Sequence, residues 1–232
     1  MASDVTRRGF LQTAGVGAAT TAALTTLSVA AAEPGAKLRI VGLACSLRQG
    51  KTTYTAMAKC LEAAKGVAPD KIEVELIDLA DRKIPAGPAA GIPLAPGERD
   101  DFPEIADKLL AADVAGIILG TPVYFGNMSS LCKAFLERCT IFRKNQFALA
   151  NKVGGVLAVG SARNGGQELT LRSVQTALFA QEMVIVGDGR PTAHCGATLW
   201  NNAGDDISQD EDGMATAVNL GRRVAETALK MR

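Results

Sequence analysis

The sequence is nearly without histidine. His194 is the only one among 232 residues, so a metal site built from several imidazoles is excluded. Cysteine is also sparse, and its spacing includes no Cys-x-x-Cys pair. We therefore expect isolated buried thiols at Cys45, Cys60, Cys132, Cys139 and Cys195.

From Glu33 onward, the sequence also has no excess of charge of either sign. Arg7, Arg8 and Asp4 are the only charged residues before Glu33, and the 23 basic and 23 acidic residues from there onward balance. No basic patch stands out, so the sequence gives no support for nucleic-acid binding. The zero net charge also argues against proteins that dock on a partner through a surface of one strong charge.

The first 32 residues have the layout of an export signal. Arg7 and Arg8 precede a mildly apolar, uncharged stretch that closes on Ala30-Ala31-Ala32, which suits signal cleavage. The arginine pair with Phe-Leu after it resembles a twin-arginine signal. We expect export by that route to the periplasm or the extracellular space, with no membrane span after cleavage. An uncleaved anchor is the alternative, because residues 9–32 are long enough to cross a bilayer.

Residues 33–232 form one predicted domain in which apolar runs alternate with helical patterns. Short, continuously apolar strands indicate a parallel sheet that is covered by helices on both faces. We predict a doubly wound, flavodoxin-like α/β fold with five strands in the order 2-1-3-4-5, which binds its ligand at the carboxyl ends of the strands. The predicted strands are 37–44, 71–79, 114–123, 152–160 and 183–187, and the predicted helices are 52–65, 101–113, 129–142, 165–182 and 210–231.

The turn after the first strand, "CSLRQGKTT", carries the chemistry of a phosphate site. A nucleoside-triphosphate loop with the pattern GxxxxGK[ST] would need glycine at position 45, where Cys45 stands, so that interpretation is disfavoured. Hydroxyls, backbone N–H groups and the N-terminus of the next helix still suit a phosphate monoester. The candidate phosphate ligands are Ser46, Arg48, Lys51, Thr52 and Thr53; solvated surface roles are the alternative for Arg48 and Lys51.

Two further loops follow predicted strands at the same edge of the sheet. The segment "PVYFG", Pro122-Val123-Tyr124-Phe125-Gly126, offers apolar area and a glycine beside which a planar ring can rest; aromatic core packing is the alternative. In "SARNGGQE", the candidates are Ser161, Arg163, Gly165 and Gly166. The two glycines expose backbone N–H groups at a helix start, and Arg163 either reaches the ligand or caps a surface loop.

Together, "SLRQGKTT", "TPVYFG" with "KAFLER", and "GGQE" resemble the NAD(P)H-dependent FMN reductase family and the related iron–sulfur flavoproteins. The resemblance covers nearly all of residues 37–232. It implies FMN on the three loops, NAD(P)H as co-substrate, a small-molecule or redox-protein electron acceptor, and a homodimer or homotetramer. The loop 85–101, where the iron–sulfur branch carries its cysteines, contains none here, so no iron–sulfur cluster is expected.

The resulting hypothesis is an FMN-dependent oxidoreductase in which the flavin supplies the chemistry. The sequence shows no acid–base dyad, so no catalytic residue is assigned, and no metal ligand either. We expect structural roles for His194 and Cys195, and a place at the edge of the site is the alternative. An exported electron carrier without nicotinamide activity is the first alternative, and a flavin-storing or interaction protein is the second.

Overall fold

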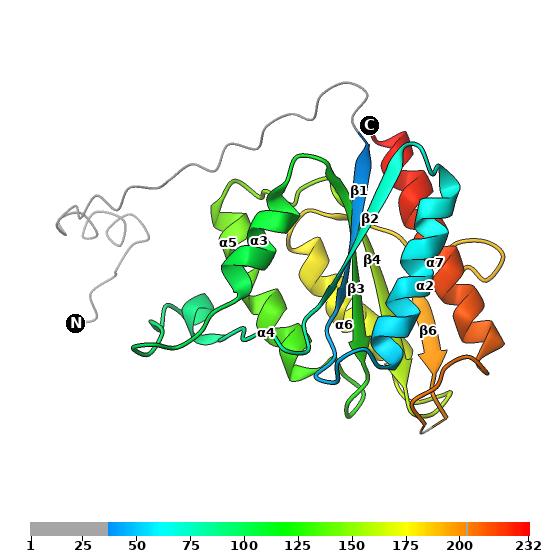
Figure 1. Ribbon diagram of the computed structural model, residues 1–232, viewed down its shortest axis with the longest axis horizontal. Coiled ribbons are helices and arrows are strands. Elements are labelled where there is room, and N and C mark those ends of the chain that lie inside the picture. The colour runs from blue at the N-terminus through cyan, green and yellow to red at the C-terminus, as the bar shows by residue number, and fades with distance from the viewer. Residues whose placement is uncertain (1–36, 203) are drawn as a thin grey trace, which may run out of the picture.

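The computed structural model describes residues 37–202 and 204–232. They form a twisted parallel sheet between two layers of helices (Figure 1). The predicted export signal, residues 1–32, lies outside the described residues, so export stays a prediction. Within the described part of the chain, no helix is both long and apolar enough to cross a membrane.

The strand order β2-β1-β3-β4-β5 confirms the predicted flavodoxin-like topology. All neighbouring pairs in this path are parallel, and the register aligns Ala44 at the end of β1 with Asp78 of β2 and Gly120 of β3. The loops that follow these strands therefore emerge at one edge, the lower one in Figure 1. The strands are β1 (Leu38–Ala44), β2 (Ile72–Asp78), β3 (Val114–Pro122), β4 (Val153–Gly160), β5 (Val184–Ile185) and β6 (Ala197–Trp200).

The fifth position of the sheet is shared by two short strands, of which the sequence predicted only the first. β5 pairs with the first two residues of β4, whereas β6 pairs with Leu157 to Gly160 at its other end. The segment 188–209, predicted as loop, thus contains a strand. Because the fifth position ends at Trp200, the loop at the ligand-binding edge begins at Asn201 rather than after Gly187.

Helices cover both faces of the sheet. α2 and α7 pack on one face and α3, α4, α5 and α6 on the other (Figure 1). The predicted helix 129–142 is in fact two helices that meet at Cys139, and a short 3-10 turn lies inside the predicted loop 85–101. The helices are α2 (Thr52–Val67), η1 (Gly87–Ala90), α3 (Phe102–Leu110), α4 (Ser130–Arg138), α5 (Thr140–Lys144), α6 (Gln167–Phe179) and α7 (Glu211–Lys230).

Alternation along the strands sorts the core into two layers. Ile40 and Ile118 face α2 and α7, whereas Val41 and Ile117 face the opposite helices. Both sets are buried, which explains why these strands read as continuous apolar runs rather than as alternating patterns.

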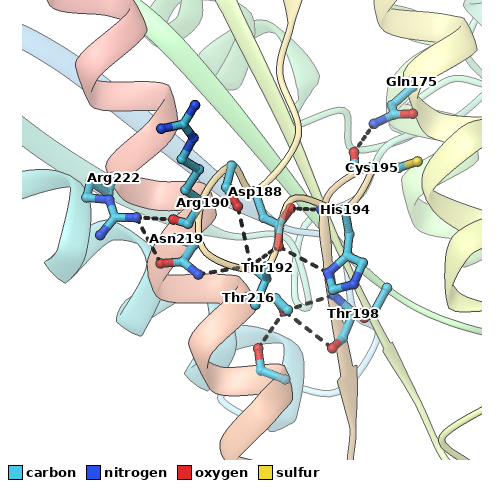
Figure 2. A network of polar contacts seen from close by, with 12 residues as sticks. Gln175, Asp188, Arg190, Thr192, His194, Cys195, Thr198, Thr216, Asn219 and Arg222 are labelled. Carbon is cyan, nitrogen blue, oxygen red and sulfur yellow. Dashed lines mark hydrogen bonds and ion pairs between the residues drawn. The ribbon is translucent and has the colours of Figure 1, made fainter.

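A buried carboxylate organises the excursion between β5 and β6 (Figure 2). Asp188 is fully buried, accepts hydrogen bonds from the His194 backbone N–H and the Thr192 hydroxyl, and lies 3.3 Å from His194 Nδ1. Asn219 of α7 donates to the Thr192 hydroxyl at 2.9 Å. His194 belongs to this excursion, and its backbone and ring both lie beside Asp188; its structural role stays a prediction.

Candidate functional site

The β1–α2 turn presents a helix N-terminus whose own N-cap residue provides no side-chain cap. Lys51 occupies the N-cap position without a capping hydrogen bond, and the first turn of α2 contains no acidic residue. Ser129 caps α4 and Asp210 caps α7, whereas α3, α5 and α6 begin, like α2, without a side-chain cap. The first N–H groups of a 16-residue helix, with its positive dipole end, thus point out at the ligand-binding edge.

Three of the predicted phosphate ligands surround this helix start with buried hydroxyl groups. Ser46, Thr52 and Thr53 are each less than 5% exposed. The Ser46 hydroxyl accepts the N–H of Arg48 at 3.0 Å, which fixes the first bend of the turn. The structure thus places these three residues together at the helix start, and their contact with a phosphate stays a prediction.

The charged residues of the same turn are held by carboxylates from other loops. Asp205 accepts a hydrogen bond from Arg48 and lies 3.2 Å from Lys51 Nζ. The guanidinium of Arg48 and then the Lys51 ammonium lower the pKa of Asp205. Asp78, at the end of β2, accepts the Gly50 N–H at 3.1 Å. Sequence reasoning missed Asp205, because it follows the strand β6 that was predicted as loop.

The segment after β3 forms a tight turn that projects from the sheet. Tyr124 and Asn127 exchange backbone hydrogen bonds of 2.8 and 3.0 Å, and both residues between them, Phe125 and Gly126, have positive φ. The Phe125 side chain is fully exposed and Tyr124 is 43% exposed, so the alternative of aromatic core packing is wrong. Val123 and Pro122 lead into this turn, and the Val123 N–H bonds Val159 O at 2.9 Å.

The loop after β4 approaches the same turn where Gly166 lies against Gly126. Gly166 has a φ of +96°, and a Cβ built on it would lie 2.9 Å from the Gly126 Cα, so only glycine fits this approach. The buried Gln167 holds the loop, because its Oε1 accepts the Gly165 N–H at 2.9 Å and its Nε2 donates to Ala162 O at 2.7 Å. The N–H of Gly165 is thus bound inside its own loop.

Arg163 and Ser161 lie farther along this loop and face the segment after β6. Arg163 pairs with the buried Asp210 and stacks over the Trp200 ring at 5.3 Å. The Ser161 carbonyl accepts the Trp200 indole N–H at 3.0 Å. This arrangement corresponds to the surface-loop alternative for Arg163; a contact of either residue with a bound ligand stays a prediction.

The buried hydroxyl of Ser129 connects the segments after β1 and β3. Ser129 Oγ donates to Cys45 O at 2.6 Å and accepts the Cys132 N–H at 3.0 Å, while the Ser129 N–H bonds Thr121 Oγ1 at 3.0 Å. Ser129 thereby joins the ends of β1 and β3 to the start of α4. Sequence reasoning did not single it out, although a serine before a helical run is an ordinary N-cap signal.

The cysteines confirm the prediction of buried thiols in four cases, whereas Cys195 is half-buried. They are not all isolated, because the proximity of Cys132, together with burial, raises the pKa of Cys45. Burial raises the pKa of Cys60 to about 12. In residues 37–202 and 204–232, no group of three or more histidine, cysteine or acidic side chains is placed to hold a metal ion.

A hollow of about 570 Å³ lies away from these loops, between the 188–193 excursion and α7 (Figure 2). It belongs to the side of the sheet and not to the edge where the strands end, so we do not assign it to the same site. Its lining is Asp188, Gly189, Arg190, Ala193, Arg222, Arg223 and Glu226.

Comparison with known proteins agrees with this geometry. The family described as NADPH-dependent FMN reductase matches residues 38–198. An iron-sulfur flavoprotein of Methanocaldococcus jannaschii is 40% identical over 195 residues, 82% of this chain and 96% of its own length. An NAD(P)H dehydrogenase (quinone) of Archaeoglobus fulgidus is 36% identical over 131 residues, 55% of this chain and 66% of its own. A solved flavodoxin, WrbA-like protein of Agrobacterium tumefaciens superposes with a TM-score of 0.59 at 19% identity, covering 85% of this chain and all of its own.

Proposed function

The chain belongs to the NADPH-dependent FMN reductase family and is a flavin oxidoreductase, and from this premise we propose its site and reaction. We propose that FMN binds across the loops after β1, β3 and β4, that NAD(P)H is the hydride donor, and that a quinone or another small acceptor takes the electrons. The name of the Archaeoglobus fulgidus relative supports the quinone.

The observation that carries this proposal is the uncapped N-terminus of α2. A phosphate monoester needs several donors and a positive potential, and this turn provides both without a metal ion. The buried hydroxyls of Ser46, Thr52 and Thr53 surround the helix start. The residues present therefore fit the phosphate group of FMN.

The other two loops fit a planar ring. Gly126 and Gly166 approach each other backbone to backbone, and neither position carries a side chain that would keep a ring away from the backbone. Tyr124 and the fully exposed Phe125 place apolar area beside it. Bound FMN supplies hydride acceptance and electron release, and the residues of the chain bind it, orient it and shield one edge from water.

We also propose that the protein works without an iron–sulfur cluster, unlike the relatives named for one. The loop after β2 contains no cysteine, although it is an ordered part of the structure. Arg138 holds it by two hydrogen bonds to Asp100, of 2.7 and 3.1 Å, and a third to Pro85 O. A clamp of this kind orders the loop without a metal.

The second candidate function is an electron carrier that has no nicotinamide activity. The export signal favours it, because NAD(P)H is a cytoplasmic compound and we propose that this chain is exported. The balanced charge argues against it, since a docking carrier profits from a strong charge of one sign.

The experiment is to purify the full chain, release its flavin with acid, and identify and quantify it. The flavin-loaded protein is then mixed anaerobically with NADH or NADPH while its visible absorbance is recorded. We expect about one FMN per chain and bleaching of the flavin band by at least one nicotinamide. FMN without bleaching would support the carrier, and a chain that takes up no flavin would contradict the proposal.

A further inference from the structure

We propose that Asp205 competes with the FMN phosphate for the two cations of the β1–α2 turn and thereby weakens FMN binding. This inference rests on the proposed function, because it concerns the same phosphate site. Asp205 has no role in the motifs that define the turn. It belongs to the segment after β6, 157 residues beyond Arg48.

The geometry gives each carboxylate oxygen of Asp205 one cation. Oδ1 accepts the hydrogen bond from Arg48 Nη1, and Oδ2 lies 3.2 Å from Lys51 Nζ. The two cations flank Gly50, directly before the uncapped N-terminus of α2. Asp205 thus places a negative charge beside the position proposed for the FMN phosphate.

A carboxylate and a phosphate bind arginine and lysine through the same kind of contact, an anionic oxygen that accepts charged N–H groups. Phosphate has the advantage in this turn, since it carries more charge and can also accept the N–H groups of α2. A carboxylate and a phosphate that contact the same two cations repel each other. Arg48 and Lys51 can therefore pair fully with only one of the two anions.

The ion pairs of Asp205 are suited to exchange. Their side chains are between 46% and 48% exposed, and ion pairs in water are individually weak. Arg48 and Lys51 also lower the pKa of Asp205, so the carboxylate is charged at neutral pH, where the phosphate is charged too. Competition by Asp205 therefore moderates the FMN affinity and does not prevent binding.

An opposite role is conceivable for the same contacts. If Asp205 held Arg48 and Lys51 in the orientation that phosphate needs, it would be a positioning residue, and its removal would weaken FMN binding. The two roles predict changes of opposite sign, so a binding measurement separates them.

The experiment compares the full chain with Asp205→Asn and with Asp206→Asn, after the flavin has been removed. Asp206 is the matched control, because among the described residues its carboxylate bonds only Ser208, through the backbone N–H and the hydroxyl, each at 2.8 Å. Each protein is titrated with FMN and with riboflavin, which lacks the phosphate, and flavin fluorescence reports binding. We expect Asp205→Asn to bind FMN about three- to tenfold more tightly, with riboflavin affinity unchanged and Asp206→Asn like wild type.

Other outcomes overturn the inference. An equal or lower FMN affinity of Asp205→Asn excludes competition, and an equal gain for riboflavin shows that the phosphate is not involved. Asp205→Ala and a circular dichroism spectrum of each variant guard against a folding effect. If wild type binds neither flavin, the proposed function itself fails, whereas FMN binding that ignores Asp205 leaves that function intact.

Discussion

Thr53 shows how a single side chain serves the proposed site. It lies in the first turn of α2 and is 1% exposed, so its hydroxyl is shielded from the solvent. We expect Thr53→Val, which keeps the shape and removes the hydroxyl, to lower FMN affinity about tenfold, the usual effect of one hydrogen bond to a charged group. Isothermal titration with FMN measures this change.

Thr55→Val is the control for that substitution. The Thr55 hydroxyl lies 3.4 Å from Lys51 O on the exposed side of the same helix, so its loss perturbs α2 without touching the phosphate site. Equal losses of affinity in both variants would assign the effect to the helix and would remove Thr53 from the site.

At the scale of residues, sequence reasoning can group side chains whose chemistry is local in the chain. Ser46, Thr52 and Thr53 follow one another in a single turn, and their hydroxyls could be recognised together. Asp205 and Ser129 could not, because their partners are distant in sequence: Ser129 Oγ bonds the carbonyl of Cys45, 84 residues earlier. Such pairings depend on the register of the sheet, which residue patterns do not specify.

Among the elements, the loop after β2 depends most on one contact. Arg138 and Asp100 are each 10% exposed, and the Arg138 guanidinium also lies 4.6 Å from the centre of the Phe102 ring. Removing one partner of a buried pair leaves the other charge unpaired. We expect Arg138→Ala to lower the free energy of unfolding by about 3 kcal/mol and to make the loop 85–101 sensitive to proteases.

Lys133→Ala, in the same helix, is the control for the loop contact. Lys133 pairs with Glu137 at the exposed surface, where such a pair contributes only about 0.5 kcal/mol. Chemical denaturation followed by circular dichroism compares the two variants. Equal stability losses would show that the Arg138–Asp100 contact does not hold the loop.

The wrong predictions of β6 and of the helix 129–142 have related physical causes. β6 is only four residues long, and the polar excursion that precedes it hides its apolar alternation. The predicted helix 129–142 bends at Cys139, where the backbone remains in the helical region and the sequence therefore shows no break. Short elements and small changes of direction are decided by tertiary packing and not by local pattern.

For the whole molecule, the strand order was predictable, because buried apolar strands that alternate with helices leave few parallel arrangements. That order brings the three loops to one edge of the sheet, where Ser129 joins the ends of β1 and β3 and Gly126 meets Gly166. The arginine-lined hollow beside α7 lies elsewhere, on the side of the sheet. The two regions therefore offer distinct places for an anion.

The central claim is that the FMN phosphate sits at the N-terminus of α2, and a crystal structure of the chain with FMN tests it most directly. We predict phosphate oxygens about 2.7–3.2 Å from the first N–H groups of α2 and from the hydroxyl of Thr53, with the ring against Gly126 and Gly166. A phosphate bound among Arg190, Arg222 and Arg223, or a ring remote from the two glycines, would contradict the account.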